Sequence, residues 1–196
     1  MARLQVPREH YLEGYDTPGR VRSYENQIRE TLSIGGGNVL EIGIGNGFVN
    51  RNLKAKGMKV ISVDIDPALN PNVMADACHL PFKDSSFDAV LCFEVLEHMP
   101  FHRSSKAMKE LERVSREFAV ISLPFSSGNA LQRIIAPFYR HLIRAEHFWE
   151  IGWLGFGLRR ILASVRDAGF EVQRHYRFEG NPYHYFIVAR KVGGGK

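Results

Sequence analysis

One stretch decides the fold of this chain: Val39-Leu40-Glu41-Ile42-Gly43-Ile44-Gly45-Asn46-Gly47. An apolar run interrupted by an acid is followed by three glycines at alternate positions. The apolar residues predict a buried strand, and the glycines predict a tight turn that leads into a helix at Phe48 to Lys56. Glycine has no Cβ, so its backbone takes unusual dihedral angles and lets a ligand approach closely. The spacing Gly-x-Gly-x-Gly also differs from the Gly-x-Gly-x-x-Gly fingerprint of dinucleotide-binding proteins.

Three further short strands follow, each with an acid at or just after its end. Lys59 to Asp64 is a β-branched run that ends 23 residues after Glu41. An acid about 20 residues after the glycine turn is where a nucleotide-binding α/β unit places its ribose ligand. A carboxylate suits that role because it accepts hydrogen bonds from both hydroxyls of a ribose. The third strand is expected at Val73 to Ala77, and the fourth at Phe87 to Phe93.

These four segments, in order from Val39 to His98, resemble the motifs of class I S-adenosylmethionine-dependent methyltransferases, and the fourth resembles the type 11 subgroup. The resemblance implies S-adenosylmethionine as cofactor and S-adenosylhomocysteine as product. It implies that Asp64 binds the ribose, that Asp76 and a small neighbour bind the adenine, and that the end of the fourth strand lies beside the methionine half. The implied cofactor-binding residues are Glu41, Gly43, Gly45, Gly47, Asp64, Ile65, Asp76, Ala77, Phe93 and Glu94.

Each acid also has a structural alternative. Asp64 and Asp76 would serve as helix caps, because Asp is a favoured N-cap residue, although their order and spacing favour ligand contact. Glu41 is expected to order the glycine loop through backbone N–H groups, and Asp88 is expected to be a structural hydrogen-bonding residue. Arg20 or Arg22 would face the cofactor carboxylate, with ordinary helix-surface charges as the alternative.

Two histidines are the candidate catalytic residues, for acceptors that carry a proton to be removed. His98 is a candidate because imidazole is suited to acid–base chemistry near neutral pH, but it is also interpretable as a structural histidine of the Glu94-Val95-Leu96-Glu97-His98 turn. His147 falls near a histidine that type 11 enzymes carry after the fifth strand, so the resemblance makes it the stronger candidate. Much of the catalysis in methyl transfer comes from orienting the nucleophile against the methyl group.

The whole chain predicts a single methyltransferase domain over residues 1–196. Its 196 residues and 22.3 kDa are enough for one buried core. No 18-residue apolar stretch and no signal-peptide core are present, so a cytoplasmic protein is expected. Cys78 and Cys92 are too few for a disulfide scaffold. No Cys/His spacing predicts a structural zinc site, and no residue is assigned as a metal ligand.

Alternating strands and helices with a final hairpin predict an α/β doubly wound, Rossmann-like sheet in three layers. The resemblance implies seven strands in the order 3-2-1-4-5-7-6, with strand 7 antiparallel. Helices are expected at Arg20 to Ser33, Arg103 to Ser115 and Leu158 to Ala168. The last strands are expected at Phe118 to Leu123, Phe170 to Arg177 and Tyr183 to Arg190. Residues 1–36 are expected to form an N-terminal helical segment, and residues 193–196 are expected to form a flexible tail.

Residues 125–156 exceed what the core fold requires, and we interpret them as a lid that carries substrate selectivity. An accessory helix with a solvent-facing side is the alternative. The stretch 118–166 contains six arginines against two glutamates and no lysine, so an anionic acceptor is favoured. Contact of residues 131–144 with a membrane surface is a further alternative. The six arginines are Arg133, Arg140, Arg144, Arg159, Arg160 and Arg166.

The sequence therefore predicts an enzyme that methylates a small molecule, with an anionic acceptor favoured. The first alternative is an RNA (tRNA or rRNA) methyltransferase, which the pI of about 9.3 permits. The second is a non-catalytic subunit that binds S-adenosylmethionine and regulates a partner, because fold alone never proves activity. The oligomeric state is left open.

Overall fold

The computed structural model describes residues 15–126, 131, 134–135 and 146–193. These residues form a seven-stranded sheet with strand order β3-β2-β1-β4-β5-β7-β6. The expected order is confirmed. Strand β7 is antiparallel to both of its neighbours, and the remaining pairs are parallel, as expected. The strands are β1 (Asn38–Ile42), β2 (Lys59–Asp64), β3 (Val73–Met74), β4 (Phe87–Phe93), β5 (Ser115–Pro124), β6 (Phe170–Arg177) and β7 (His184–Lys191).

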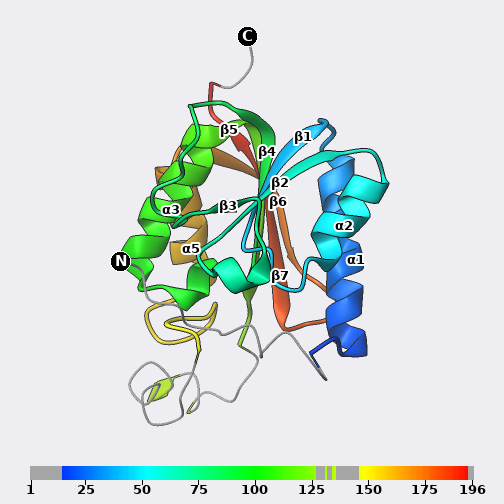
Figure 1. Cartoon of the computed structure of the whole chain (residues 1–196). Helices are drawn as coiled ribbons and strands as arrows, with labels where there is room; N and C mark the ends of the chain where they lie inside the picture. The colour runs from blue at the N-terminus through cyan, green and yellow to red at the C-terminus, as the bar shows by residue number, and fades with distance from the viewer. Residues whose placement is uncertain (1–14, 127–130, 132–133, 136–145, 194–196) are drawn as a thin grey trace.

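Helices cover both faces of the sheet, which gives the expected three layers (Figure 1). Helices α1 (Pro18–Ser33) and α2 (Phe48–Ala55) lie on one face, and α3 (Phe101–Val114) and α5 (Leu158–Asp167) lie on the other. Two 3-10 turns, η2 (Pro67–Leu69) and η3 (Leu96–His98), follow β2 and β4. No helix among the described residues has the length and apolar character needed to cross a membrane.

The central strands are apolar on both sides because both of their faces are covered. Strand β4 buries five of its seven residues, and β1 buries four of five. One core cluster forms under α3 and α5 around Leu40, Val90 and Ile121. The other forms under α1 and α2 around Val39, Leu91 and Val120. Alternate residues of one strand thus enter opposite cores, as the period of a β-strand requires.

Element boundaries differ from expectation where local hydrogen bonds decide them. Helix α1 starts two residues earlier than expected, because Thr17 accepts from the Arg20 N–H and Pro18 occupies the first turn. Strand β3 is only two residues long, because Asp76 already forms a turn with the Cys78 N–H. Strand β5 begins earlier, at Ser115, directly after α3.

Part of the expected lid packs into the core. Trp149 is fully buried, and its indole N–H donates to the Met99 carbonyl and the Ser104 hydroxyl, at 3.1 and 3.2 Å. Ile151 forms a parallel bridge with Phe125 at the end of β5. Most of residues 127–145, with Arg133, Arg140 and Arg144, lie outside the described residues, as do the tail residues 194–196. The lid function of 125–156 stays a prediction.

The junction between α1 and β1 is fixed by Asp88. One carboxylate oxygen of Asp88 accepts from the backbone N–H groups of Gly37 and Asn38, both at 3.0 Å, and the other pairs with Arg116. Burial on its own would raise the pKa of Asp88, but these N–H donors and the guanidinium lower it below its usual value. Asp88 is therefore the structural residue that the sequence indicated.

Gly36 lies at this junction with φ +84°, and a Cβ there would come within 2.8 Å of the Asp88 Cβ. We expect Gly36→Ala to lower the free energy of unfolding by about 1–3 kcal/mol, from left-handed strain and overpacking. Gly37→Ala is the matched control, because its added methyl meets nothing within 4 Å, and it should change stability by less than about 0.5 kcal/mol. Urea denaturation of the three proteins measures this. Equal losses in both variants would contradict the prediction.

Candidate active site

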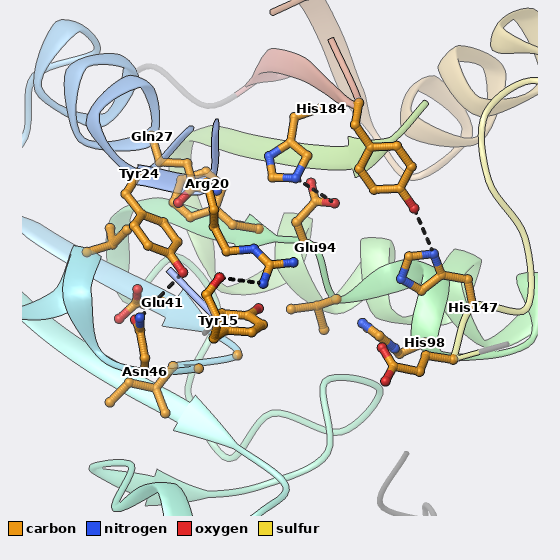
Figure 2. Close-up of a pocket in the computed structure, with 18 residues that line it drawn as sticks. Tyr15, Arg20, Tyr24, Gln27, Glu41, Asn46, Glu94, His98, His147 and His184 are labelled. Carbon is orange, nitrogen blue, oxygen red and sulfur yellow. Dashed lines mark hydrogen bonds and ion pairs between the residues drawn. The ribbon is translucent and has the colours of Figure 1, made fainter. Parts of the chain in front are cut away.

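A pocket of about 120 Å³ opens at the carboxyl ends of β1 and β4. This is the edge where doubly wound α/β sheets bind their ligands. Figure 2 shows two groups of side chains on opposite sides of the pocket, with Glu94 and His184 between them. We name them the glycine-loop wall and the histidine wall. The glycine-loop wall comprises Tyr15, Arg20, Tyr24, Gln27, Glu41, Gly43, Ile44, Gly45, Asn46 and Val49, and the histidine wall comprises His98, Glu146, His147 and Tyr183.

The glycine loop depends on backbone conformations that other residues rarely adopt. Gly43, Gly45 and Gly47 have φ values of 79°, 53° and 73°. A Cβ on Gly43 would collide with the side chain of Val95, which follows β4. Gly43 also donates its N–H to the Val63 carbonyl at 2.8 Å. The loop is thus held between β2 and the turn after β4, and Gly43 and Gly45 line the pocket while Gly47 does not.

Glu41 lies in β1, two residues before Gly43, and is buried. Its carboxylate accepts from the side-chain amide of Asn50 at 2.8 Å. The described residues show no hydrogen bond from a loop N–H to this carboxylate, so the structure gives Glu41 a side-chain partner on α2 instead of the expected backbone donors. Burial raises the pKa of Glu41 to about 7, while Asn50 and Lys54 oppose the shift.

Asp64 orders the loop from the end of β2. Its two oxygens accept from the backbone N–H groups of Ile44 and Asp66, at 3.0 and 2.9 Å. Burial raises the pKa of Asp64 despite these donors. The cap of η2 is Asp66, not Asp64, so the capping alternative does not apply to Asp64. Asp64 and Ile65 do not line the pocket itself.

The carboxylate of Asp76 is hydrogen-bonded and ion-paired to neighbouring residues. It accepts from the Cys78 N–H at 2.9 Å and forms an ion pair with Arg103 of α3. Burial alone would raise the pKa of Asp76, but the Cys78 N–H and the Arg103 guanidinium lower it. Asp76 and Ala77 lie outside the pocket lining. Ligand binding by Asp64, Ile65, Asp76 and Ala77 therefore stays a prediction.

The sequence left open whether Arg20 or Arg22 of the N-terminal helix faces the pocket. Arg20 lines the pocket, and its guanidinium lies 3.6 Å from the centre of the Tyr15 ring and donates to the Tyr15 carbonyl. Arg22 instead donates to the Gly180 carbonyl, away from the pocket. Tyr24 stacks on Phe48. Its hydroxyl and the side-chain amide of Asn46 both donate a hydrogen bond to the same carboxylate oxygen of Asp16.

Glu94 sits where the two walls meet. It has φ +53°, a left-handed conformation that non-glycine residues rarely adopt and that clusters at functional sites. Ser122 of β5 holds it twice, because the Glu94 N–H donates to the Ser122 carbonyl and the Ser122 hydroxyl donates to the Glu94 carboxylate. His184 faces the other carboxylate oxygen at 3.7 Å. Phe93 also lines the pocket.

The structure brings the two candidate catalytic histidines together. The rings of His98 and His147 meet edge to face with centroids 4.8 Å apart, although 49 residues separate them in the sequence. The segment of His147 is attached to η3, because the Phe148 N–H donates to the Glu97 carbonyl at 2.7 Å. His147 Nδ1 lies 2.9 Å from the Glu150 carboxylate, and the Tyr183 hydroxyl donates to the same oxygen at 2.8 Å.

Several pocket residues carried no recognisable sequence signal. Tyr24 accepts a side-chain hydrogen bond from the loop residue Asn46, and the Tyr15 ring packs against Arg20, and no motif encodes either contact. Tyr183 and His184 lie at the start of β7, beside β5, so only the sheet order places them near Glu94. The antiparallel position of β7 is the one signal that would have located them.

Comparisons with known proteins agree with this geometry. The family model described as a methyltransferase domain of type 11 matches residues 40–122. An uncharacterized methyltransferase of Mycobacterium sp. is 29% identical over 190 residues, covering 92% of this chain and 67% of that protein. The ubiquinone biosynthesis O-methyltransferase of Xanthomonas oryzae pv. oryzae is 31% identical over 88 residues, which cover 37% of each protein. The chain therefore spans well under two thirds of that curated relative.

Among solved structures, the magnesium protoporphyrin IX methyltransferase of Synechocystis PCC 6803 with bound S-adenosylhomocysteine superposes with a TM-score of 0.71. It is 17% identical, and the match covers 94% of this chain and 92% of that one. At this identity the likeness concerns the fold. Sheet order, glycine loop and strand-end pocket together define a class I methyltransferase fold. Residues 40–122 match the model of the methyltransferase domain, and the described residues have the fold of class I S-adenosylmethionine-dependent methyltransferases.

The buried Glu41 should make stability depend on pH. Its pKa is raised from 4.5 to about 7, so the folded protein binds this proton more tightly than the unfolded chain does. This contribution to stability is present below about pH 4.5 and is lost as the pH rises through about 7. Glu41→Gln keeps an acceptor for Asn50 and carries no charge. The melting temperature of Glu41→Gln relative to wild type should therefore rise between pH 5 and pH 8.

Thermal melts of the ligand-free protein in matched buffers measure this difference. Each unit of the shift corresponds to about 1.4 kcal/mol. Glu25→Gln, on the exposed side of α1, is the control and should show no such trend. A difference between Glu41→Gln and wild type that stays constant with pH would contradict the assignment of a neutral, buried Glu41.

Proposed function

We propose that this protein transfers a methyl group from S-adenosylmethionine to an oxygen atom of a small-molecule acceptor. One observation carries the proposal: a single pocket joins the glycine-loop wall to the histidine wall. The first wall fits the cofactor and the second fits an acceptor that loses a proton. The match of residues 40–122 to the methyltransferase domain supports the donor, and likeness to the ubiquinone biosynthesis O-methyltransferase supports oxygen as the acceptor atom.

The residues of the glycine-loop wall fit the parts of this cofactor. The Gly43 and Gly45 backbone leaves room for close approach. Arg20 presents a guanidinium, which binds carboxylates, at the position suited to the methionine carboxylate. Glu94, at the junction of the walls, suits the methionine ammonium. Asp64 keeps acceptor capacity for ribose hydroxyls beside the loop, because each carboxylate oxygen has more than one lone pair.

S-adenosylmethionine supplies a methyl group on a positively charged sulfur. When it is transferred, a carbon–oxygen bond forms with an acceptor lone pair, the carbon–sulfur bond breaks, and its electron pair stays on sulfur. The acceptor proton must leave. His147 is placed to take it, because the Glu150 carboxylate holds Nδ1 and leaves Nε2 available. His98, in contact with the His147 ring, narrows the space in which the acceptor oxygen lies.

The preference for an anionic acceptor rests on six arginines, and three of them lie outside the described residues. Arg160 is described, and it packs over the rings of Phe101 and Phe156 and donates to the Gly155 carbonyl. It is thus a structural residue rather than a contributor to an anion site. The charge of the acceptor remains a prediction that depends on Arg133, Arg140 and Arg144.

Cofactor binding tests the first part of the proposal. Calorimetric titration should show binding of S-adenosylmethionine and S-adenosylhomocysteine, with NAD as the control that does not bind. Arg20→Ala should weaken S-adenosylmethionine binding about tenfold to a hundredfold, because it removes a charge-assisted contact. Arg22→Ala is matched in helix and residue type and should bind like wild type. Equal affinity of Arg20→Ala and wild type would remove Arg20 from the cofactor site.

Acceptor class tests the second part. Release of S-adenosylhomocysteine should be measured with a panel of hydroxylated aromatic compounds and, separately, with total tRNA. We expect turnover with members of the small-molecule panel and none with tRNA. Salt-sensitive turnover on tRNA alone would support the RNA alternative instead. Cofactor binding without turnover on either would favour the regulatory-subunit alternative.

A further inference from the structure

Three potential metal ligands converge at the base of the histidine wall. Glu97, His98 and His147 each offer one ligand atom, and these atoms all lie within 4.8 Å of one another. Glu97 Oε1 and His98 Nε2 lie 4.0 Å apart. His98 and His147 line the pocket, whereas Glu97 does not line it and its side chain is fully buried. The cluster therefore has a buried side and a side that a small acceptor can reach.

Glu97 is the unusual member of the cluster. Its side chain has no exposed surface, and neither carboxylate oxygen has a hydrogen-bond partner among the residues that the structure describes. A buried carboxylate without partners costs several kcal/mol in an average protein interior unless it is neutralised or binds a cation. Apart from the imidazole of His98 at 4.0 Å, no ion-pair partner of Glu97 is found among the described residues.

The orientation of His147 fits a ligand role. When Nδ1–H donates to the Glu150 carboxylate, the lone pair of the ring lies on Nε2. Tyr183 donates to the same Glu150 oxygen and fixes the carboxylate. Metal-binding histidines usually donate their second ring N–H to a carboxylate or carbonyl in this way, which sets the tautomer and strengthens the ligand.

The ligand atoms of Glu97, His98 and His147 need to move only slightly to coordinate one ion. Two donors each about 2.1 Å from a metal lie at most about 4.2 Å apart. The 4.0 Å approach already meets this limit, and the widest separation of 4.8 Å exceeds it by about half an ångström. Rotation of partly exposed side chains supplies that shift, since the side chains of His98 and His147 are 21% and 18% exposed.

We propose that Glu97, His98 and His147 bind one divalent transition-metal ion at the base of the pocket. Two imidazoles and a carboxylate suit Zn²⁺, Co²⁺, Mn²⁺ or Fe²⁺, and open coordination positions would face the pocket. Glu97 and His98 lie in η3, and His147 follows His98 by 49 residues. The three ligands therefore do not form a short sequence motif that would predict a metal site. Metal binding stands on this geometry alone.

The role of the ion rests on the proposed function. A metal that coordinates an acceptor hydroxyl lowers its pKa, so the proton passes to solvent and the oxygen attacks as an alkoxide or phenolate. The charge balances because the transferred methyl group leaves a neutral thioether on the donor. In this arrangement His147 holds the metal instead of accepting the acceptor proton.

Metal titration of the whole chain tests the proposal directly. Protein stripped with EDTA and then dialysed is titrated with Co²⁺, and binding is followed by visible d–d absorption and by calorimetry with Mn²⁺ and Zn²⁺. We expect one ion per chain in wild type. Glu97→Gln, His98→Ala and His147→Ala should each weaken binding more than tenfold, and Glu150→Gln should weaken it about tenfold through the orientation of His147. His102→Ala, an exposed histidine of α3, is the control and should bind like wild type.

Folding and cofactor binding are measured on the same proteins. Circular dichroism confirms that each variant is folded, and Glu97→Gln, which preserves side-chain size, covers the case in which an alanine variant unfolds. S-adenosylmethionine binding in EDTA should equal that of the metal-loaded protein within about threefold. Its loss in both states would remove the proposed function while leaving the metal site standing. Wild type without 1:1 binding of any of the three ions, or a loss in His102→Ala equal to that in Glu97→Gln, would overturn the metal proposal.

Discussion

The pocket depends on the close parallel pairing of β1 and β4. Their register, Ile42 opposite Cys92, ends both strands at the same edge and sets the glycine loop against the turn that begins at Glu94. The contact is so close that Gly43 has no room for a Cβ beside Val95. The close contact between Gly43 and Val95 thus brings the glycine-loop wall and the histidine wall into one pocket. A larger residue at Gly43 or Val95 would push the glycine-loop wall and the histidine wall apart.

The second wall depends on an anchor far along the chain. Trp149 fills the core under α3 and satisfies its indole N–H on Met99 and Ser104, while Phe148 binds the Glu97 carbonyl. These contacts hold His147 against His98 without a regular element. Burial of a large aromatic side chain contributes several kcal/mol, enough to fix an irregular segment. The same residues that stabilise the core therefore position the polar groups of the pocket.

Sequence predicted the sheet and the loop well because both follow from local patterns. Apolar runs, alternate glycines and strand-end acids are periodic or contiguous signals, and the order of all seven strands was implied by resemblance and confirmed. The pairing of Glu41 with Asn50 was not predicted, since a side-chain amide on the next helix competes with loop N–H groups only in three dimensions. Tyr183, His184 and Glu150 escaped notice for the same reason. Their positions follow from tertiary packing, which no short spacing encodes.

The charge distribution links the two walls. Glu97, Glu146 and Glu150 lie on the histidine side and Glu94 lies between the walls, and Arg20 is the arginine among the residues that line the pocket. A cationic sulfonium beside Glu94 would offset part of this negative charge, whereas Glu97 does not line the pocket. Protonation of Glu97 would relieve the repulsion and leave an inert buried acid. A divalent ion would relieve it too and would place an electrophile where the acceptor enters. The contact between the two histidine rings and the Glu150 carboxylate beside His147 Nδ1 both fit the second solution.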